Sequence, residues 1–132
     1  MKVYVAAPWV RKQDAIAAAG RLRGAGITVT SQWFDHGGDP NDSTGESVPD
    51  AEIRDQAIQD YNDVARADYV MVLNLEKSEG KAVETGFAIA MNKPFICVGP
   101  RSNIFQVLGA GMFQSVEDAV AYLKGVEQAE TV

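Results

Sequence analysis

Ser-Glu-Gly-Lys-Ala-Val-Glu-Thr-Gly-Phe-Ala-Ile-Ala-Met-Asn-Lys-Pro-Phe-Ile-Cys-Val, residues 78–98, is the stretch that decides the fold. Its pattern predicts a loop at 78–80, a helix over about 81–91 and an apolar strand over 95–98. Pro94 closes the turn between them, because proline cannot continue a helix and drives its predecessor to extended geometry. A helix that leads at once into an apolar strand is typical of chains in which helices alternate with parallel strands.

Glu84 is the unusual residue of this helix. The helix is apolar on nearly every side, as buried helices are, and Glu84 falls among Phe87, Ala88 and Met91 on the helical wheel. Burying a lone carboxylate is unfavourable, so its presence there needs a cause. Two explanations stay open at this point: the helix N-terminus or Lys81 stabilises the charge locally, or the carboxylate serves a function.

The rest of the chain alternates between short apolar runs and helical patterns. The expected strands cover residues 2–7, 27–30, 69–74, 95–98 and 111–114, and the expected helices cover about 13–23, 49–65, 81–91, 104–108 and 115–124. Ser47 is the expected N-cap of the helix over 49–65, Gly125 is expected to end the last helix, and 127–132 to form a frayed tail.

This alternation predicts an α/β fold of the flavodoxin-like or Rossmann-like kind, with helices on both faces of the sheet in a three-layer arrangement. Five parallel strands fit the order 2-1-3-4-5 in one domain spanning 1–132. Ligands of such sheets bind beyond the carboxyl ends of the strands, where the first and third strands lie side by side. The loops at 8–12 and 75–80 should therefore meet there and bring Glu84 with them.

A second acid, Asp60, lies on the expected buried stripe of the helix over 49–65. The stripe is formed by residues at helical spacing, namely Ile53, Ala57, Tyr61 and Val64. Asp63 is expected at the edge of this stripe. The alternative to a functional role for Asp60 is a local ion pair with Arg66 or Lys81.

Residues 31–48 show no periodicity and form the longest expected loop. A loop of this length in a small domain is usually either functional or disordered. Trp33 and Phe34 at its start favour a lid or a pocket wall, and the alternative is that they pack on the sheet edge. His36 is a titratable residue in this loop, and we assign it no catalytic role.

Composition excludes several classes of function. The net charge of −6 and the pI of about 4.7 argue against binding a nucleic-acid polymer. The one cysteine, Cys97, excludes a disulfide framework and a cysteine metal site, and one histidine makes a zinc site unexpected. With no signal peptide and no apolar run long enough to span a membrane, we expect no membrane partner and a cytoplasmic location.

The sequence lacks the Gly-x-Gly-x-x-Gly, Walker A and Gly-x-Ser-x-Gly motifs, which removes the usual basis for a dinucleotide, nucleoside triphosphate or serine hydrolase site. Two acids near one expected pocket remain. Paired carboxylates suit the cleavage of glycosidic bonds, because one attacks the anomeric carbon and the other protonates the leaving group.

At this level of detail the chain resembles the nucleoside 2-deoxyribosyltransferase family, which includes deoxynucleoside 5′-monophosphate N-glycosidases. Residues 3–9 (Val-Tyr-Val-Ala-Ala-Pro-Trp) look like its first strand, and residues 84–88 (Glu-Thr-Gly-Phe-Ala) look like its Glu-Leu-Gly-x-Ala segment. Asp60, eight residues before Asp68, is similar to its catalytic aspartate. Residues 102–105 (Ser-Asn-Ile-Phe) resemble its stretch that reaches into a neighbouring subunit.

The resemblance implies cleavage or transfer of the N-glycosidic bond of a nucleoside or its 5′-monophosphate through a covalent glycosyl ester on Glu84. It implies three catalytic residues, with Glu84 as the nucleophile, Asp60 as the acid, and Tyr4 orienting Glu84. The helix N-terminus should keep Glu84 ionised and therefore nucleophilic. The resemblance also implies no cofactor and no metal, and a homodimer or larger assembly. The residues expected to bind substrate are Ser78 and Arg11 at a phosphate, Trp33 at the base, Asn103 from a partner subunit, and Trp9 and Gly80.

Departures from the family's pattern leave the substrate open. Ser78, six residues before Glu84, favours a phosphate, since the monophosphate hydrolases have a serine near this spacing and the transferases an aspartate. Their first loop is Gly-Ser-Ile-Arg-Gly-like, whereas residues 7–11 here are Ala-Pro-Trp-Val-Arg. The base, the sugar and the acceptor are not determined. The alternative from another class is a non-catalytic nucleotide-binding module on the same fold. A flavin-binding protein is a weaker alternative, because the first loop is not rich in Ser and Thr.

Overall fold

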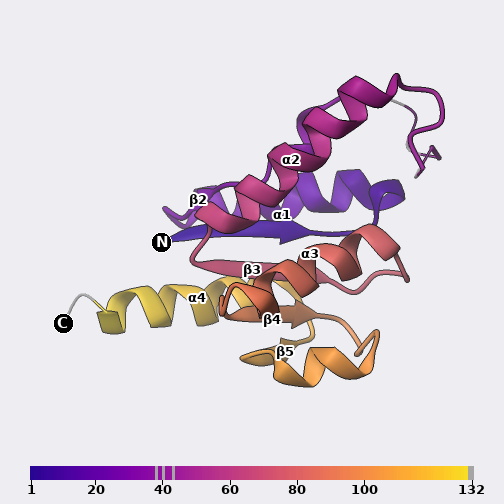
Figure 1. The fold of residues 1–132 in the computed structure, drawn as a ribbon. Helices are drawn as coiled ribbons and strands as arrows, with labels where there is room; N and C mark the ends of the chain where they lie inside the picture. The colour runs from indigo at the N-terminus through magenta and orange to yellow at the C-terminus, as the bar shows by residue number, and fades with distance from the viewer. Residues whose placement is uncertain (38, 40, 43, 131–132) are drawn as a thin grey trace.

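A parallel sheet lies between two layers of helices in the computed structural model, which describes residues 1–37, 39, 41, 42 and 44–130 (Figure 1). The strands are β1 (Lys2–Ala6), β2 (Thr28–Val29), β3 (Tyr69–Leu73), β4 (Phe95–Val98) and β5 (Gly111–Phe113). All neighbouring strands pair in parallel, in the order β2-β1-β3-β4-β5. The predicted fold class and strand order are confirmed.

The helices are α1 (Lys12–Gly24), α2 (Asp50–Arg66), α3 (Glu79–Ala90) and α4 (Val116–Glu130). Three short 3₁₀ helices join them, namely η1 (Trp9–Arg11), η2 (Trp33–Asp35) and η3 (Ile104–Leu108). Helices α2 and α3 pack together on one face of the sheet, and α1 and α4 pack together on the other (Figure 1). None of the helices in the described part of the chain is long and apolar enough to cross a membrane.

The central strands form the core because their side chains are apolar on both faces. Residues 3–6, 70–73 and 95–98 are all buried, as expected of strands covered on two sides. Cys97 is a buried free cysteine in β4. Because β1 lies between β2 and β3, the chain reverses its direction of winding at β1, and the carboxyl ends of β1 and β3 lie side by side.

Helix α3 is not buried all round, contrary to the sequence prediction. Its side toward the sheet buries Lys81, Thr85 and Ala88, whereas Val83 is 53% exposed. The helix also begins two residues earlier than predicted, at Glu79, because the Ser78 hydroxyl accepts a hydrogen bond from the Lys81 N–H and caps it. An outer helix of a three-layer fold needs only one apolar side, and the apolar residues on its other side stay in contact with solvent.

The buried side of α2 also differs from the predicted stripe. Val64 is buried as expected, but Tyr61 is 47% exposed and packs edge-on against Phe87 of α3, with ring centroids 5.1 Å apart. Asp63, predicted at the edge, is buried instead. The side of α2 that faces the sheet thus includes Asp63, which has polar partners there, described below.

Two predicted helix ends were wrong. Ser47 does not cap α2, because its hydroxyl and N–H both donate to Asp42, and Pro49 precedes the helix. Helix α4 continues through Gly125 to Glu130, because Leu123 is buried ahead of it and Lys124 pairs with Glu127 across it. The last predicted tail residues, 131 and 132, lie outside the described residues.

Candidate active site

A cavity of about 660 Å³ opens beyond the carboxyl ends of β1 and β3. Its walls come from the loop after β1, the segment that follows η2, helix α2, and the loop that leads into α3. The sequence-predicted residues that line it are Trp9, Trp33, Asp60, Ser78, Gly80 and Glu84. The fold therefore places this cavity where ligands of such sheets bind.

Tyr4 reaches Glu84 from the sheet. Tyr4 is fully buried in β1, and its hydroxyl donates a hydrogen bond to Glu84 Oε2 (residues 80 apart in the chain). Burial raises the pKa of the Tyr4 hydroxyl well above its usual range, and the negative charges of Glu84 and Asp60 raise it further. Tyr4 therefore stays a hydrogen-bond donor and fixes one oxygen of Glu84.

The Glu84 carboxyl is a weaker acid than the sequence suggested. Burial raises its pKa to about 8, the hydrogen bond from Tyr4 lowers it, and the charge of Asp60 raises it again. Burial therefore opposes the ionised form of Glu84 that the sequence predicts, and the helix N-terminus offsets this effect only weakly. Glu84 lies in the second turn of α3, and the influence of a helix end fades within the first turn.

Asp60 faces the same cavity from α2. Its Oδ1 is buried and accepts no hydrogen bond from any described residue. Burial raises the pKa of Asp60 to about 6, the charge of Asp63 raises it further, and His36 lowers it. Asp60 and Glu84 thus form a pair of carboxyls that share about one proton near pH 7.

Neither acid has the local ion-pair partner that was the alternative explanation. The ammonium of Lys81 turns away from Glu84 and contacts Asn74 Oδ1 at 3.2 Å, the Glu76 carbonyl at 2.9 Å and Ser102 Oγ at 3.4 Å. Arg66 pairs with Asp63 rather than with Asp60. The two cavity carboxyls are therefore left available to a bound molecule.

Ser78 and Gly80 lie at the N-terminus of α3. Ser78 is the N-cap of this helix, and its Oγ accepts from the Lys81 N–H at 3.3 Å, which leaves its O–H free to donate into the cavity. Gly80 lies in the first turn of the helix and lines the cavity beside it. Exposed N–H groups at such a helix start are a natural place for an anion or a polar group.

The two tryptophans form one wall of the cavity. Trp33 is only 5% exposed, its indole N–H donates to the Val5 carbonyl at 2.9 Å, and its ring lies 5.8 Å from that of Trp9. Trp9 is less buried, donates to the Asp39 carbonyl at 2.8 Å, and has the Lys12 ammonium 5.1 Å from its ring centroid. Trp9 therefore offers more ring surface to a ligand than Trp33 does.

Arg11 and Asn103 are not among the described residues that line the cavity. The Arg11 guanidinium contacts Asp14 at 2.7 Å and Glu76 at 3.7 Å, so its charge is already matched by two carboxylates. Asn103 caps η3 by accepting from the Phe105 N–H at 2.9 Å and is exposed. The structure does not bring these two predicted residues to the carboxyl pair.

Two further residues act on Asp60 through their charges, Asp63 and His36, and neither had a predicted role. Their signals were present in part: Asp63 stands one helical turn after Asp60 and one turn before Arg66, a spacing that suits mutual contact. His36 lines the cavity, and its ring nitrogen Nε2 lies 2.6 Å from Gln59 Oε1.

Two solved structures are similar to this chain over most of its length. A 2-deoxyribosyltransferase from Bacillus psychrosaccharolyticus is 19% identical with a TM-score of 0.70, over 91% of this chain and 90% of that one. A CMP N-glycosidase from Clostridium botulinum is 16% identical with a TM-score of 0.56, over 93% and 98%. No protein-family model and no curated protein matches the chain. The chain therefore has the α/β fold of the nucleoside 2-deoxyribosyltransferase-like proteins.

Proposed function

We propose that this protein cleaves or transfers the N-glycosidic bond of a nucleoside or its 5′-monophosphate. One observation carries the proposal: two carboxyls face one cavity, Glu84 held by the Tyr4 hydroxyl and Asp60 with an Oδ1 that accepts no hydrogen bond from a described residue. Active sites typically contain such pairs, in which the surroundings give neighbouring titratable groups different pKa values. The two similar structures, a transferase and an N-glycosidase, act on bonds of this class.

The proposed chemistry needs the proton on Asp60 and the negative charge on Glu84. Because Glu84 has the higher pKa, this is the less populated of the two forms in which the pair holds one proton. A Glu84 oxygen attacks the anomeric carbon, the bond from that carbon to the base nitrogen breaks, and its electron pair stays on the nitrogen. Asp60 gives its proton to the departing base. Water, or a second base, then attacks the same carbon and releases the sugar from Glu84, and Asp60 recovers a proton in this step.

The remaining predicted residues complete the proposed site. Ser78 and Gly80 bind the 5′ end of the sugar. Trp9 and Trp33 form the wall against which the base packs, so that the base lies between them and the carboxyl pair. The second candidate function is a non-catalytic module that binds a nucleotide on the same fold. Its distinguishing property is tolerance of the loss of Glu84.

The direct test is incubation with a panel of nucleosides and 5′-monophosphates, with free base measured by chromatography. Base release from at least one member, with and without a second base as acceptor, supports the reaction and shows whether water or a base is used. Binding without base release across the panel would favour the non-catalytic module.

Ser78 provides a prediction about the 5′ group of the substrate. Ser78→Asp should lower kcat/KM for a monophosphate more than for the matched nucleoside, because an aspartate repels phosphate and accepts from a sugar hydroxyl. Ser78→Ala should lower kcat/KM for the monophosphate by about 10- to 100-fold, as expected for a lost hydrogen bond to a charged group. Equal losses for both substrates would show that Ser78 does not contact the phosphate.

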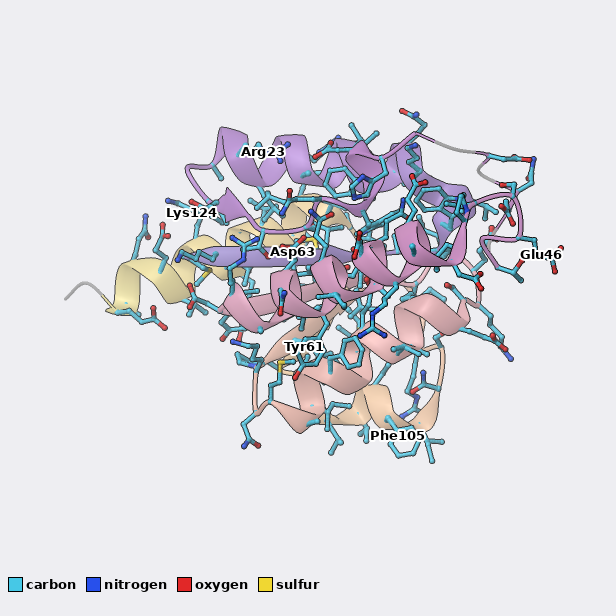
Figure 2. The ribbon with its side chains drawn as sticks, turned by 45° about the horizontal axis from the view of Figure 1, so that its top comes forward. Arg23, Glu46, Tyr61, Asp63, Phe105 and Lys124 are labelled. Carbon is cyan, nitrogen blue, oxygen red and sulfur yellow. The ribbon has the colours of Figure 1, made fainter. Side chains whose placement is uncertain are left out.

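Asn103 provides a prediction about assembly. It caps η3, and the apolar side chains of this short helix are largely exposed to solvent. Their exposed fractions are 74% for Ile104, 61% for Phe105, 68% for Val107 and 62% for Leu108. Figure 2 shows Phe105 at the outer edge of the molecule. We propose that this face contacts a second copy and that Asn103 enters the partner's cavity. Asn103→Ala and Glu84→Gln should each be inactive alone.

Unfolding the two variants together and refolding the mixture should restore about a quarter of the parent activity. Half of the randomly formed dimers then contain one copy of each variant, and one of the two sites in such a dimer is complete. Light scattering that finds an active monomer, or a mixture that stays inactive, would remove Asn103 from the site.

A further inference from the structure

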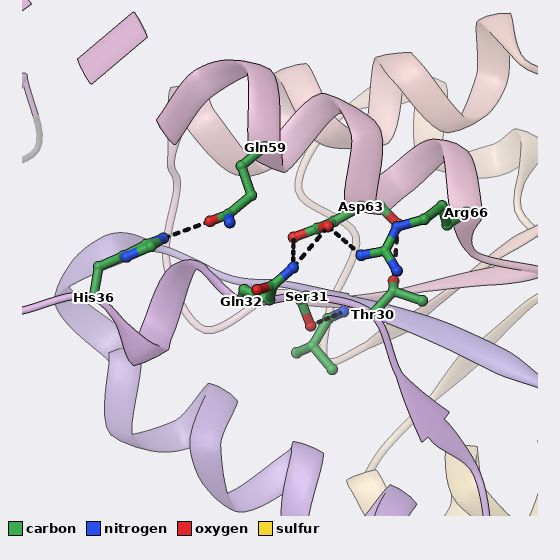
Figure 3. Close-up of polar contacts among 8 residues, drawn as sticks. Thr30, Ser31, Gln32, His36, Gln59, Asp63 and Arg66 are labelled. Carbon is green, nitrogen blue, oxygen red and sulfur yellow. Dashed lines mark hydrogen bonds and ion pairs between the residues drawn. The ribbon is translucent and has the colours of Figure 1, made fainter. Parts of the chain in front are cut away.

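Asp63 is a buried carboxylate on α2 whose two oxygens both accept hydrogen bonds. It is 1% exposed, and Gln32 Nε2 donates to Oδ1 at 3.1 Å and to Oδ2 at 3.3 Å. Arg66 Nη2 donates to Oδ1 at 2.5 Å. Figure 3 shows the Asp63 carboxylate between Gln32 and Arg66. The buried Asp63 carboxylate thus accepts hydrogen bonds from one neutral and one cationic side chain.

The backbone beside Asp63 is also fixed. Thr30 Oγ1, just after β2, donates to the Asp63 main-chain carbonyl at 2.8 Å, and Ser31 Oγ accepts from the Val5 N–H of β1 at 3.0 Å. These contacts join the last turns of α2 to β1 and to the chain after β2. The negative charge of Asp63 therefore has a fixed position relative to the cavity.

Asp60 is the opposite case on the same helix. It lies one turn earlier, on the side of α2 that Asp63 shares, and its buried Oδ1 has no donor among the described residues. The charged or titratable groups that act on it are Asp63 from α2, His36 from the segment after η2, and Glu84 from α3 with its partner Tyr4 from β1. The arrangement puts all the donors on Asp63 and leaves Asp60 beside a fixed negative charge.

We propose that Asp63, held by Arg66 and Gln32, is a positioning residue that strengthens the hold of Asp60 on a proton and so raises the population of the form in which Asp60 is the acid. This inference rests on the proposed function, in which Asp60 protonates the departing base. Asp63 contacts neither the cavity nor the reacting atoms. It acts on Asp60 through its charge, and Arg66 limits how strong that charge becomes.

The proposal gives a signature in the pH dependence of the reaction. Between limbs near pH 6 and 8 the carboxyl pair holds about one proton, and the reactive form is the one with this proton on Asp60. Weakening the hold of Asp60 on its proton tenfold moves the acidic limb down by one pH unit. It also lowers the plateau of kcat/KM by the same tenfold factor, because the reactive form becomes rarer.

The experiment compares the parent with Asp63→Asn, Arg66→Gln and the control Asp55→Asn. Asp55 is an exposed acid on the same helix, so its replacement makes the same change of charge at a distant point. The Asp60 carboxyl is titrated by ¹³C NMR, with its signal assigned by Asp60→Asn. The pH profile of kcat/KM is measured with a nucleoside, which has no phosphate that titrates in this range.

In Asp63→Asn the pKa of Asp60 should fall by roughly 0.5 to 2, as expected when a charge one helical turn away is removed. The acidic limb should move by the same amount, with a matching loss of roughly 3- to 100-fold in the plateau. Arg66→Gln removes the cation instead and should raise the pKa of Asp60. Because the expected change in the Asp60 pKa has the opposite sign, Arg66→Gln still tests the proposal if Asp63→Asn does not fold.

An Asp60 pKa that stays the same in both variants, or moves as much in Asp55→Asn, overturns the proposal. A rate loss in Asp63→Asn without a displaced limb also overturns it, because a merely structural role would give that result. Failure of the proposed function looks different: the NMR titration would change as expected while the parent releases no base from any substrate.

Discussion

Replacement of Glu84 by glutamine should abolish base release while the fold stays intact. Glutamine has the same shape and can still accept the hydrogen bond from Tyr4, so the packing of α3 on β1 is preserved. It cannot form the glycosyl ester, because the amide is a poor nucleophile and carries no negative charge. We expect kcat to fall by at least about 10³-fold, as for the loss of a covalent catalyst.

Glu117→Gln is the matched control for this prediction. Glu117 lies on α4, on the opposite face of the sheet, where it forms an exposed ion pair with Arg21. Its replacement should leave kcat unchanged. Near-normal turnover in a folded Glu84→Gln protein would rule out the nucleophile, and trapping of a glycosyl adduct on Glu84, seen by mass spectrometry, would establish it.

The same Glu84→Gln variant should be more stable than the parent at neutral and alkaline pH. The folded pKa of Glu84 is about 8 against an ordinary 4.5, so the folded state binds more protons than the unfolded state between these values. Stability of the parent therefore falls as pH rises through this window. Glutamine has no proton to lose, so the variant avoids the loss.

The gain should be near zero below pH 4.5 and up to about 3 kcal/mol at pH 7, which corresponds to roughly 10 °C in Tm for a domain of this size. Denaturant unfolding of both proteins at pH 4.5, 7 and 9 measures it. The control Glu117→Gln should lose less than about 1 kcal/mol with little change across this range, as exposed ion pairs do. A gain that does not grow with pH would mean that Glu84 is ionised in the free protein.

The sequence was sufficient to predict the sheet because its strands are continuous apolar runs, and such runs occur where both faces of a sheet are covered. The buried residues 3–6 and 70–73 show this directly. The strand order then predicts the ligand site, because ligands of such sheets bind beyond the carboxyl ends of β1 and β3. This rule correctly predicted that Glu84 and Ser78 line the cavity. The acids of the site could therefore be named before the structure was known.

The ionisation of the site could not be predicted in the same way. Whether Glu84 is charged depends on how much water its neighbours exclude and on the hydrogen bond from Tyr4, and periodicity carries neither quantity. Asp63 shows the same limit. Its pattern placed it at the edge of a stripe, whereas Gln32, 31 residues away in sequence, draws it into the interior. Contacts between distant segments decided both cases.

The position of β1 in the sheet has a consequence for how the protein folds. Strand β1 pairs with β2 soon after it in the chain, but it pairs with β3 only when residues near 70 are in place, as Tyr4 lies beside Val70. Pairings of such long range form slowly, because a long loop must close before they stabilise the chain.

The contact between Tyr4 and Glu84 spans 80 residues and crosses this same junction. A chain that has formed its helices and the pairing of β1 with β2 still has its two cavity acids on separate segments. We therefore expect the carboxyl pair to assemble among the last features during folding, in the step that docks β3 and α3 against the first strand. Partly folded chains would hold Asp60 and Glu84 in water, each with the ordinary acidity of an exposed carboxyl.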